Sequence, residues 1–179
     1  MPEIEIRPVM AEDIPTMIAI DHNYTSDYVW QMEIQIQEKG VNLSFREVHL
    51  PRSVRVEYPR LPGSLADDWE QRDGILVALL KGELVGYTSL MLNMAPATTW
   101  MTDLAVTRRL RRQGIGSLLV LAAQEWGVQH DSRNLVLEIQ TKNYPAIHLA
   151  RKLGFDFSGY NDRYYANHDI GLFFAKSLR

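Results

Sequence analysis

The sequence predicts a single α/β domain in which a mixed β-sheet carries helices on both faces. Apolar strand-like segments alternate with two helical segments in the second half of the chain, and strands joined through a crossover helix run parallel. With 179 residues, of which 46% are hydrophobic and 23% charged, the chain can bury one full core. No repeat, low-complexity segment or linker interrupts it, so residues 1–179 are expected to form one unit.

The first forty residues are expected to contribute a strand and two helices. Residues 3–9 alternate charged and aliphatic side chains, as a strand with one wet face does. Residues 11–20 have acidic residues in their first turn and apolar residues on one face, which predicts a helix. Residues 27–39 are a second helix candidate, closed by Gly40.

The middle of the chain is expected to be mainly strand and loop. Residues 44–58 predict one or two strands, interrupted at Pro51. Residues 59–73 are rich in turn formers and acids and predict a loop. Residues 74–80 and 84–92 are apolar on either side of a Lys-Gly-Glu turn, which indicates a β-hairpin.

The second half alternates strands and helices. The predicted elements are a strand at 100–106, a helix at 115–128, a strand at 135–141, a helix at 144–153, and strands at 155–160 and 171–178. Gly154 is expected to end the second of these helices, because glycine adopts the left-handed conformation that closes many helices.

The composition excludes several kinds of protein. The net charge of −3 argues against a nucleic-acid partner. The absence of cysteine excludes disulfides, thiolate metal sites and a cysteine nucleophile, and the five histidines lack the spacing of metal ligands, so no metal is expected. We see no signal peptide and no apolar run of the roughly 18 residues that span a membrane. A cytoplasmic protein without a membrane partner is the default expectation.

A basic turn with two glycines joins the predicted strand 101–106 to the helix that follows. It reads Arg-Arg-Gln-Gly-Ile-Gly over residues 111–116. Glycine lets the backbone approach a ligand closely, and the first N–H groups of a helix attract anions. Leu119 stands where a dinucleotide fingerprint needs its third glycine, and no Gly-Lys pair marks a P-loop. The turn suits a phosphate group, and the alternative is an ordinary strand-to-helix turn with a solvated basic patch.

A second motif follows between residues 135 and 155. A strand leads to Asn143, and a helix then ends in Leu-Gly-Phe. The two motifs in this order resemble the GNAT superfamily of N-acetyltransferases, in which an amine attacks the thioester of acetyl-CoA directly. The resemblance covers essentially the whole chain and is strongest from about Gly74 onward. It implies a GNAT fold with six to seven strands and about four helices, and acetyl-CoA as co-substrate.

The resemblance can be narrowed to a branch. Three short segments resemble streptothricin acetyltransferases, which modify the β-lysine amine of that antibiotic. They are residues 137–143, Tyr164–Asn167, and Asp103 with the Leu-Ala-Val that follows it at 104–106. This implies N-acetylation of a small cationic amine and a role in antibiotic resistance. Two alternatives stay open: acetylation of a peptide or protein N-terminus, and a non-catalytic acyl-CoA sensor. Homodimers are common in the family, which makes the last two strands candidate contact elements.

The resemblance also implies which residues hold the cofactor. The pantetheine arm would pair with Leu104, Ala105 and Val106, with the Leu104 N–H on the acetyl carbonyl. The pyrophosphate would lie at the turn formed by Arg111, Arg112, Gln113, Gly114, Ile115, Gly116 and Ser117. Asn143 would bind the pantetheine arm, and the alternative is that it only caps its helix.

Asp103 and Glu138 are the candidates for the catalytic base, because each lies near the end of a strand expected to flank the thioester. Either one has a structural role as its alternative. The tyrosine that commonly protonates the CoA thiolate in the family is replaced by Ala150. Its substitute would be solvent or one of four tyrosines, namely Tyr144, Tyr160, Tyr164 and Tyr165.

The acceptor is expected to meet the first third of the chain and the loop 59–73. Four acids in that loop would suit a cationic amine. The alternative is that the loop is merely solvated.

Overall fold

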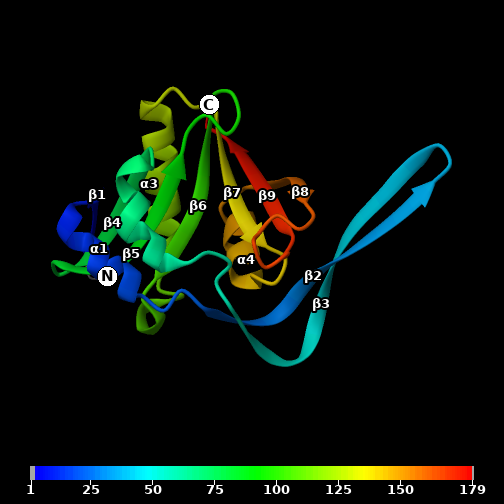
Figure 1. The fold of residues 1–179 in the computed structure, drawn as a ribbon, viewed down its shortest axis with the longest axis horizontal. Helices are drawn as coiled ribbons and strands as arrows, with labels where there is room; N and C mark the ends of the chain where they lie inside the picture. Colours follow the sequence, from blue (N-terminus) through cyan, green and yellow to red (C-terminus); the bar gives the residue numbers. More distant parts are fainter. Residues whose placement is uncertain (1–2, 179) are drawn as a thin grey trace.

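A seven-stranded mixed sheet forms the centre of the molecule (Figure 1). The structure is a computed structural model, and it describes residues 3–178. In sheet order, the strands are β1 (Ile4–Pro8), β4 (Gly74–Leu80), β5 (Glu83–Met91), β6 (Thr98–Val106), β7 (Asn134–Gln140), β9 (Gly171–Ser177) and β8 (Asp156–Asn161). The α-helices of these residues are α1 (Ile14–Ala19), α2 (Leu65–Asp68), α3 (Ile115–Gln129) and α4 (Tyr144–Lys152). This confirms the predicted α/β class and its strand and helix numbers.

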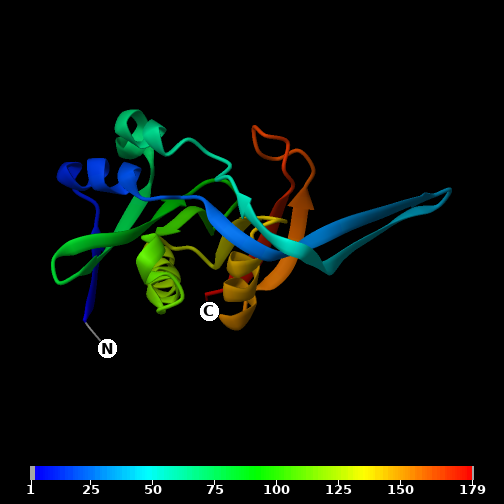
Figure 2. The same ribbon diagram turned by 90° about the horizontal axis from the view of Figure 1, so that it is seen from below.

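Helices cover both faces of this sheet, as expected. Successive residues of β4 point to opposite faces, so Leu76 and Ala78 join the core under α3 and α4, whereas Ile75 and Val77 join the core under α1 and α2. Figure 2 shows the two pairs of helices on opposite sides of the sheet. The sheet is therefore buried on both sides over its centre.

The parallel crossovers create the feature that matters most for function. Strands β6 and β7 are parallel and pair from Thr98↔Asn134 to Met101↔Leu137. Beyond that point β6 continues beside β5 as far as Val106, but its pairing with β7 has ended. The two central strands thus splay apart, and main-chain groups along the inner edges are left for another partner.

The segment 27–39 is strand up to Gln37 and then the turn of a hairpin, so the predicted second helix is wrong. Residues 24–56 form a long hairpin of β2 (Tyr24–Gln37) and β3 (Gly40–Val56), which extends beyond the body of the molecule as an arm (Figures 1 and 2). The alternation Met-Glu-Ile-Gln-Ile over 32–36 has the period of a strand, and these apolar side chains pair with Phe45, Leu43 and Val41 opposite. Gly40 begins the return strand and caps no helix.

Two other segments are more regular than expected. Strand β3 passes through Pro51 without ending, because the register shift between Ser26 and Tyr28 leaves this proline outside the paired ladder. The predicted loop 59–73 contains short helical turns at Pro62–Ser64, α2 and Trp69–Gln71, and it is anchored by the buried Leu65. The predicted helix 11–20 begins as a 3₁₀ turn at Ala11–Asp13 and continues as α1.

The remaining elements lie where the sequence places them, within one or two residues. Gly154 has φ +79° and closes α4, as predicted. Within residues 3–178, no helix combines the length and the apolar character that crossing a membrane would need.

Candidate active site

A cleft lies where β6 and β7 separate. Its volume is about 550 Å³, including its open mouth. The lining residues come from both strands, from α4 and from the connections that follow β3 and β8: Tyr58, Pro59, Arg60, Met101, Thr102, Asp103, Leu104, Leu137, Glu138, Ile139, Gln140, Asn143, Ala146, Leu149 and Tyr165. The predicted residues Asp103, Leu104, Glu138 and Asn143 are thus brought together in one place.

The N–H of Leu104 faces this cleft. The carbonyl oxygen of Asp103 accepts a hydrogen bond from the Thr88 hydroxyl of β5 at 2.8 Å. The N–H and C=O of a trans peptide point in opposite directions. Since that carbonyl is directed at β5, the Leu104 N–H of the same peptide is directed at the splay.

The basic turn presents the open N-terminus of α3. Gly114 is the N-cap with φ +90°, and Arg112 also has a positive φ, of 62°. No side chain caps this end, and no acidic residue lies in the first turn of the helix. Uncapped N–H groups at a helix N-terminus form an anion site, so the turn has the geometry expected of a phosphate-binding loop.

Arg111 is used differently from the expectation. Its guanidinium donates to the Val106 carbonyl at 2.9 Å, to the Asn23 carbonyl at 2.7 Å and also to the Asp21 carbonyl. The side chain therefore fastens the turn to the segment that leads into the arm, and it is turned away from a phosphate role. Arg112 is exposed beside the helix N-terminus.

Asn143 has the capping role that the sequence allowed. Its side-chain carbonyl accepts from the Ala146 N–H at 3.1 Å, at the start of α4. It also lines the cleft, so capping and a contact with a bound arm are compatible.

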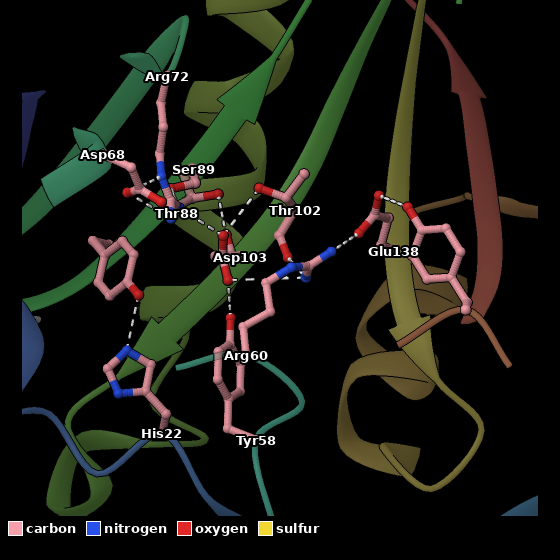
Figure 3. A network of polar contacts seen from close by, with 12 residues as sticks. His22, Tyr58, Arg60, Asp68, Arg72, Thr88, Ser89, Thr102, Asp103 and Glu138 are labelled. Carbon is pink, nitrogen blue, oxygen red and sulfur yellow. Dashed lines mark hydrogen bonds and ion pairs between the residues drawn. The ribbon is translucent and has the colours of Figure 1, made fainter. Parts of the chain in front are cut away.

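The Asp103 carboxylate is buried and surrounded by donors. It accepts hydrogen bonds from the Tyr58 hydroxyl, from Arg72 Nη1 at 2.9 Å and from the Thr102 hydroxyl at 3.0 Å (Figure 3). Arg72 is itself held by Asp68 and Ser89. A carboxylate with this many donors has most of its acceptor capacity filled.

The Glu138 carboxylate lies across the cleft from Asp103, and its side chain is fully buried. It accepts from Arg60 Nη2 at 2.5 Å and from the Tyr164 hydroxyl at 2.5 Å. Burial raises the pKa of Glu138 above its ordinary value, and the charge of Arg60 acts in the opposite direction. A carboxyl with a raised pKa accepts a proton more readily than an ordinary glutamate does, so Glu138 is suited to act as a base.

Two residues of this site, Tyr58 and Arg60, could not be identified from the sequence, and neither could the contact of Arg72 with Asp103. Arg60 lies in the segment 59–73, whose acids dominate its composition, yet its guanidinium spans the cleft to Glu138 (Figure 3). Asp68 pairs with Arg72 at 3.1 Å, so the two arginines offset much of the acidity expected of this rim. The signal in the sequence was the pair of arginines themselves, in a segment whose other charges are acidic.

Of the four candidate tyrosines, Tyr165 alone lines the cleft. It is buried, and burial raises the pKa of its hydroxyl, which keeps the hydroxyl protonated. Tyr164 donates to Glu138, Tyr144 contacts Glu47 of the arm at 3.3 Å, and Tyr160 packs against Phe45. Ala150 is buried in the core below the cleft. Among residues 3–178, no cluster of three or more His, Asp or Glu side chains is arranged to hold a metal ion.

Comparison with known proteins gives consistent matches. Residues 42–155 match the Acetyltransferase (GNAT) family. The chain is 25% identical over 166 residues to a streptothricin acetyltransferase of Streptomyces lavendulae, covering 90% of this chain and 86% of that protein.

Two further proteins extend the comparison. A shorter match, 33% identical over 92 residues, is to a Bacillus subtilis protein provisionally named ribosomal protein bS18-alanine N-acetyltransferase, and covers 51% of this chain and 60% of that one. A solved Bacillus anthracis structure, provisionally named a streptothricin acetyltransferase and bound to acetyl-CoA, superposes with a TM-score of 0.75 at 18% identity. It covers 98% of this chain and 99% of that one.

Proposed function

Because the chain belongs to the GNAT family of acetyltransferases, we propose that it transfers the acetyl group of acetyl-CoA to the primary amine of a small cationic acceptor of the streptothricin type. The observation that carries this proposal is the cleft between β6 and β7, in which two buried carboxylates, Asp103 and Glu138, face the splayed strands. Anionic groups that line a cleft attract and orient a cationic amine. The likeness to a streptothricin acetyltransferase supports the same acceptor class.

Acetyl-CoA would enter from the side of the basic turn. We assign the pyrophosphate to the main-chain N–H groups of residues 112–117 and to the charge of Arg112, without the Arg111 side chain. The pantetheine arm would lie along residues 104–106 and reach Asn143. That an acetyl-CoA-bound relative has the same fold supports this assignment.

The transfer then needs three groups. The Leu104 N–H would donate to the acetyl carbonyl and stabilise the oxyanion that forms when the amine attacks. Glu138 would take a proton from the bound ammonium, because only the neutral amine has the lone pair that attacks the thioester. As the new C–N bond forms and the C–S bond breaks, Tyr165 would give a proton to the departing thiolate. Asp103 would hold Tyr58 and Arg72 in place.

The test is thiol release from acetyl-CoA by the purified protein, across streptothricin, spermidine and short peptides with free N-termini. We expect release with the cationic small amines, and an acetylated β-lysine amine by mass spectrometry of streptothricin. Release with peptides alone would replace this acceptor by a protein N-terminus, which the bS18-alanine relative makes the second candidate. Calorimetric binding of acetyl-CoA without transfer to any amine would contradict the enzymatic proposal and favour a sensor.

A role in antibiotic resistance follows from this proposal. Cells that express the protein are expected to grow at higher streptothricin concentrations than cells that express the Glu138→Gln variant. Equal growth of the two strains would contradict the role.

A further inference from the structure

Arg60 places a positive charge inside the cleft, at the point where the proposed acceptor would bring its own. We propose that the Arg60 guanidinium occupies the binding site of the acceptor's cationic group, and that the acceptor binds by displacing it. This inference rests on the proposed function, and it adds a defined cation subsite and an internal group that competes for it.

The surroundings of the guanidinium are those of a cation-binding site. Nη2 of Arg60 lies 2.5 Å from Glu138 Oε2. Nη1 of Arg60 lies 2.7 Å from the Thr102 carbonyl oxygen and 4.0 Å from Asp103 Oδ1. The ring of Tyr165 lies under it, 5.2 Å from the ring centroid to the guanidinium carbon. Two carboxylates, a carbonyl and an aromatic face can bind either an ammonium or a guanidinium, whichever molecule supplies it.

The parts of this site differ in how firmly they are fixed. The carboxylates belong to the central strands, and their side chains are 4% and 0% exposed, for Asp103 and Glu138 respectively. Arg60 lies in the connection 57–61, outside any helix or strand, and its side chain is 30% exposed. The guanidinium is therefore the component that an incoming molecule can reach and move.

Arg72 provides the contrast. Its side chain is 14% exposed, and it donates to Asp68, Ser89 and Asp103 together. If Arg60 is displaced, Asp103 keeps Arg72 as its cationic partner. Glu138 keeps the Tyr164 hydroxyl and gains the incoming amine. Each acid thus keeps a distinct role, Asp103 as a fixed anion and Glu138 as the proton acceptor.

The exchange would also prepare the base. The positive charge of Arg60 favours the ionised form of Glu138 and so weakens it as a proton acceptor. An ammonium in the same place also keeps Glu138 ionised, but unlike the guanidinium it can give up a proton to this carboxylate.

Replacement of Arg60 and refilling of its space with methylguanidine tests the inference. In Arg60→Ala, we expect the KM for streptothricin to fall about tenfold, because the competing group is gone. Methylguanidine should inhibit this variant competitively against streptothricin and non-competitively against acetyl-CoA, and should inhibit the wild type about tenfold less. Arg55→Ala, which removes an arginine that is 62% exposed, is the matched control and should behave as the wild type does.

Several outcomes would overturn it. If Arg60→Ala lowers kcat without lowering KM, and methylguanidine restores kcat, the guanidinium is a working part of the site that positions Glu138. Equal inhibition of the wild type and the variant would show that the space does not hold the cation. Should Arg60→Ala fail to fold, Arg60→Gln keeps a polar side chain without the charge; an unchanged KM and unchanged methylguanidine inhibition in that variant would contradict displacement.

A calorimetric titration separates this inference from the proposed function, because it needs no turnover. Methylguanidine is expected to bind Arg60→Ala and to bind the wild type at least about tenfold more weakly. Such binding with no acetyl transfer to any amine would preserve the cation site while the enzymatic proposal fails. Transfer by the wild type with no methylguanidine binding to the variant would leave the enzyme and remove the site.

Discussion

The two buried carboxylates of the cleft differ in how many donors surround them. Asp103 accepts from three side chains, one of which is a fully engaged arginine, so its charge is locked into the structure. Glu138 accepts from Arg60 and Tyr164, and burial works against its charge. The difference in environment separates their roles more clearly than their positions in the sequence do.

The pH dependence of acetyl transfer should report Glu138. A base acts only when ionised, so kcat/KM should fall as the pH drops through its pKa. An ordinary glutamate has a pKa of about 4.3. Because burial raises the pKa of Glu138, the acidic limb should lie above that value. Glu138→Gln should lower kcat by about 100-fold or more and abolish this limb, with acetyl-CoA affinity retained. A pH profile that is unchanged in the variant would assign the limb to another group.

Tyr165 is the candidate donor to the CoA thiolate, because it lines the cleft and keeps its proton. Tyr165→Phe should lower kcat about 10- to 100-fold with little change in the KM for acetyl-CoA. Tyr144→Phe serves as control, since Tyr144 lies outside the cleft, against the arm. Equal rates for both variants would favour proton delivery by solvent.

At the scale of elements, two connections determine what the sheet can do. The turn into α3 brings uncapped N–H groups to the mouth of the splay, and its backbone needs a left-handed residue at Gly114. The β2–β3 arm is held to the body by aromatic packing of Trp30 against Phe174 and Phe157. The main-chain N–H of Trp30 also donates a hydrogen bond to the Thr141 carbonyl at 3.0 Å.

Gly114→Ala tests the turn. A side chain at φ +90° costs about 1 kcal/mol, and relaxation of the strain would move the N–H groups of the turn. We expect acetyl-CoA binding, measured by calorimetry, to weaken together with a modest loss of stability. Gly63→Ala is the control, because its φ is ordinary and no atom lies within 4 Å of the added carbon. Unchanged affinity in Gly114→Ala would remove the turn from the binding site.

Trp30→Ala tests how the arm is fixed. The loss of this partly buried ring should destabilise the fold by about 2–3 kcal/mol, measured by chemical denaturation. Ile36→Ala, at a position of the arm that is 83% exposed, should change stability by less than about 0.5 kcal/mol. Similar effects of both substitutions would mean that the outer part of the arm is packed in solution.

The whole molecule combines a firmly packed sheet with an open seam at its centre. Hydrophobic clusters on both faces hold the strands, while β6 and β7 part on the side where the cleft opens. Acetyl-CoA filling this seam would supply partners to main-chain groups that now lack strand pairing. The homodimer stays a prediction; of its two suggested contact strands, β8 lies at an edge of the sheet and β9 lies one strand further in. The cytoplasmic location also stays a prediction.

A ligand that binds only the folded protein must stabilise it. At a concentration of acetyl-CoA 100 times its Kd, the gain should be about 2.7 kcal/mol, which raises Tm by about 2–4 °C for each kcal/mol in a chain of this size. Differential scanning fluorimetry with desulfo-CoA as a comparison would measure it. If acetyl-CoA shifted the Tm of neither the wild type nor Gly114→Ala, binding in the seam would be contradicted.

The sequence by itself determined the strands and helices from residue 74 onward, the glycine turn that begins α3 and the cap at Asn143. These features depend on local rules, namely the period of apolar residues, the conformational freedom of glycine and the bonding of cap side chains, which neighbouring residues satisfy among themselves. The same reasoning also found Asp103 and Glu138, because both stand on strands that the motifs identify.

Only the tertiary structure decided the arm, the ion pairs made by Arg60 and Arg72, and the centre of the cleft. Residues 27–37 became a strand because residues of β3 pair with them, and no local preference reveals that partner. Arg60 and Glu138 are 78 residues apart in the chain, and they meet because β3 returns its end to the seam between β6 and β7. Which charge faces which acid is a property of long-range packing, and the chemistry of this site depends on that pairing.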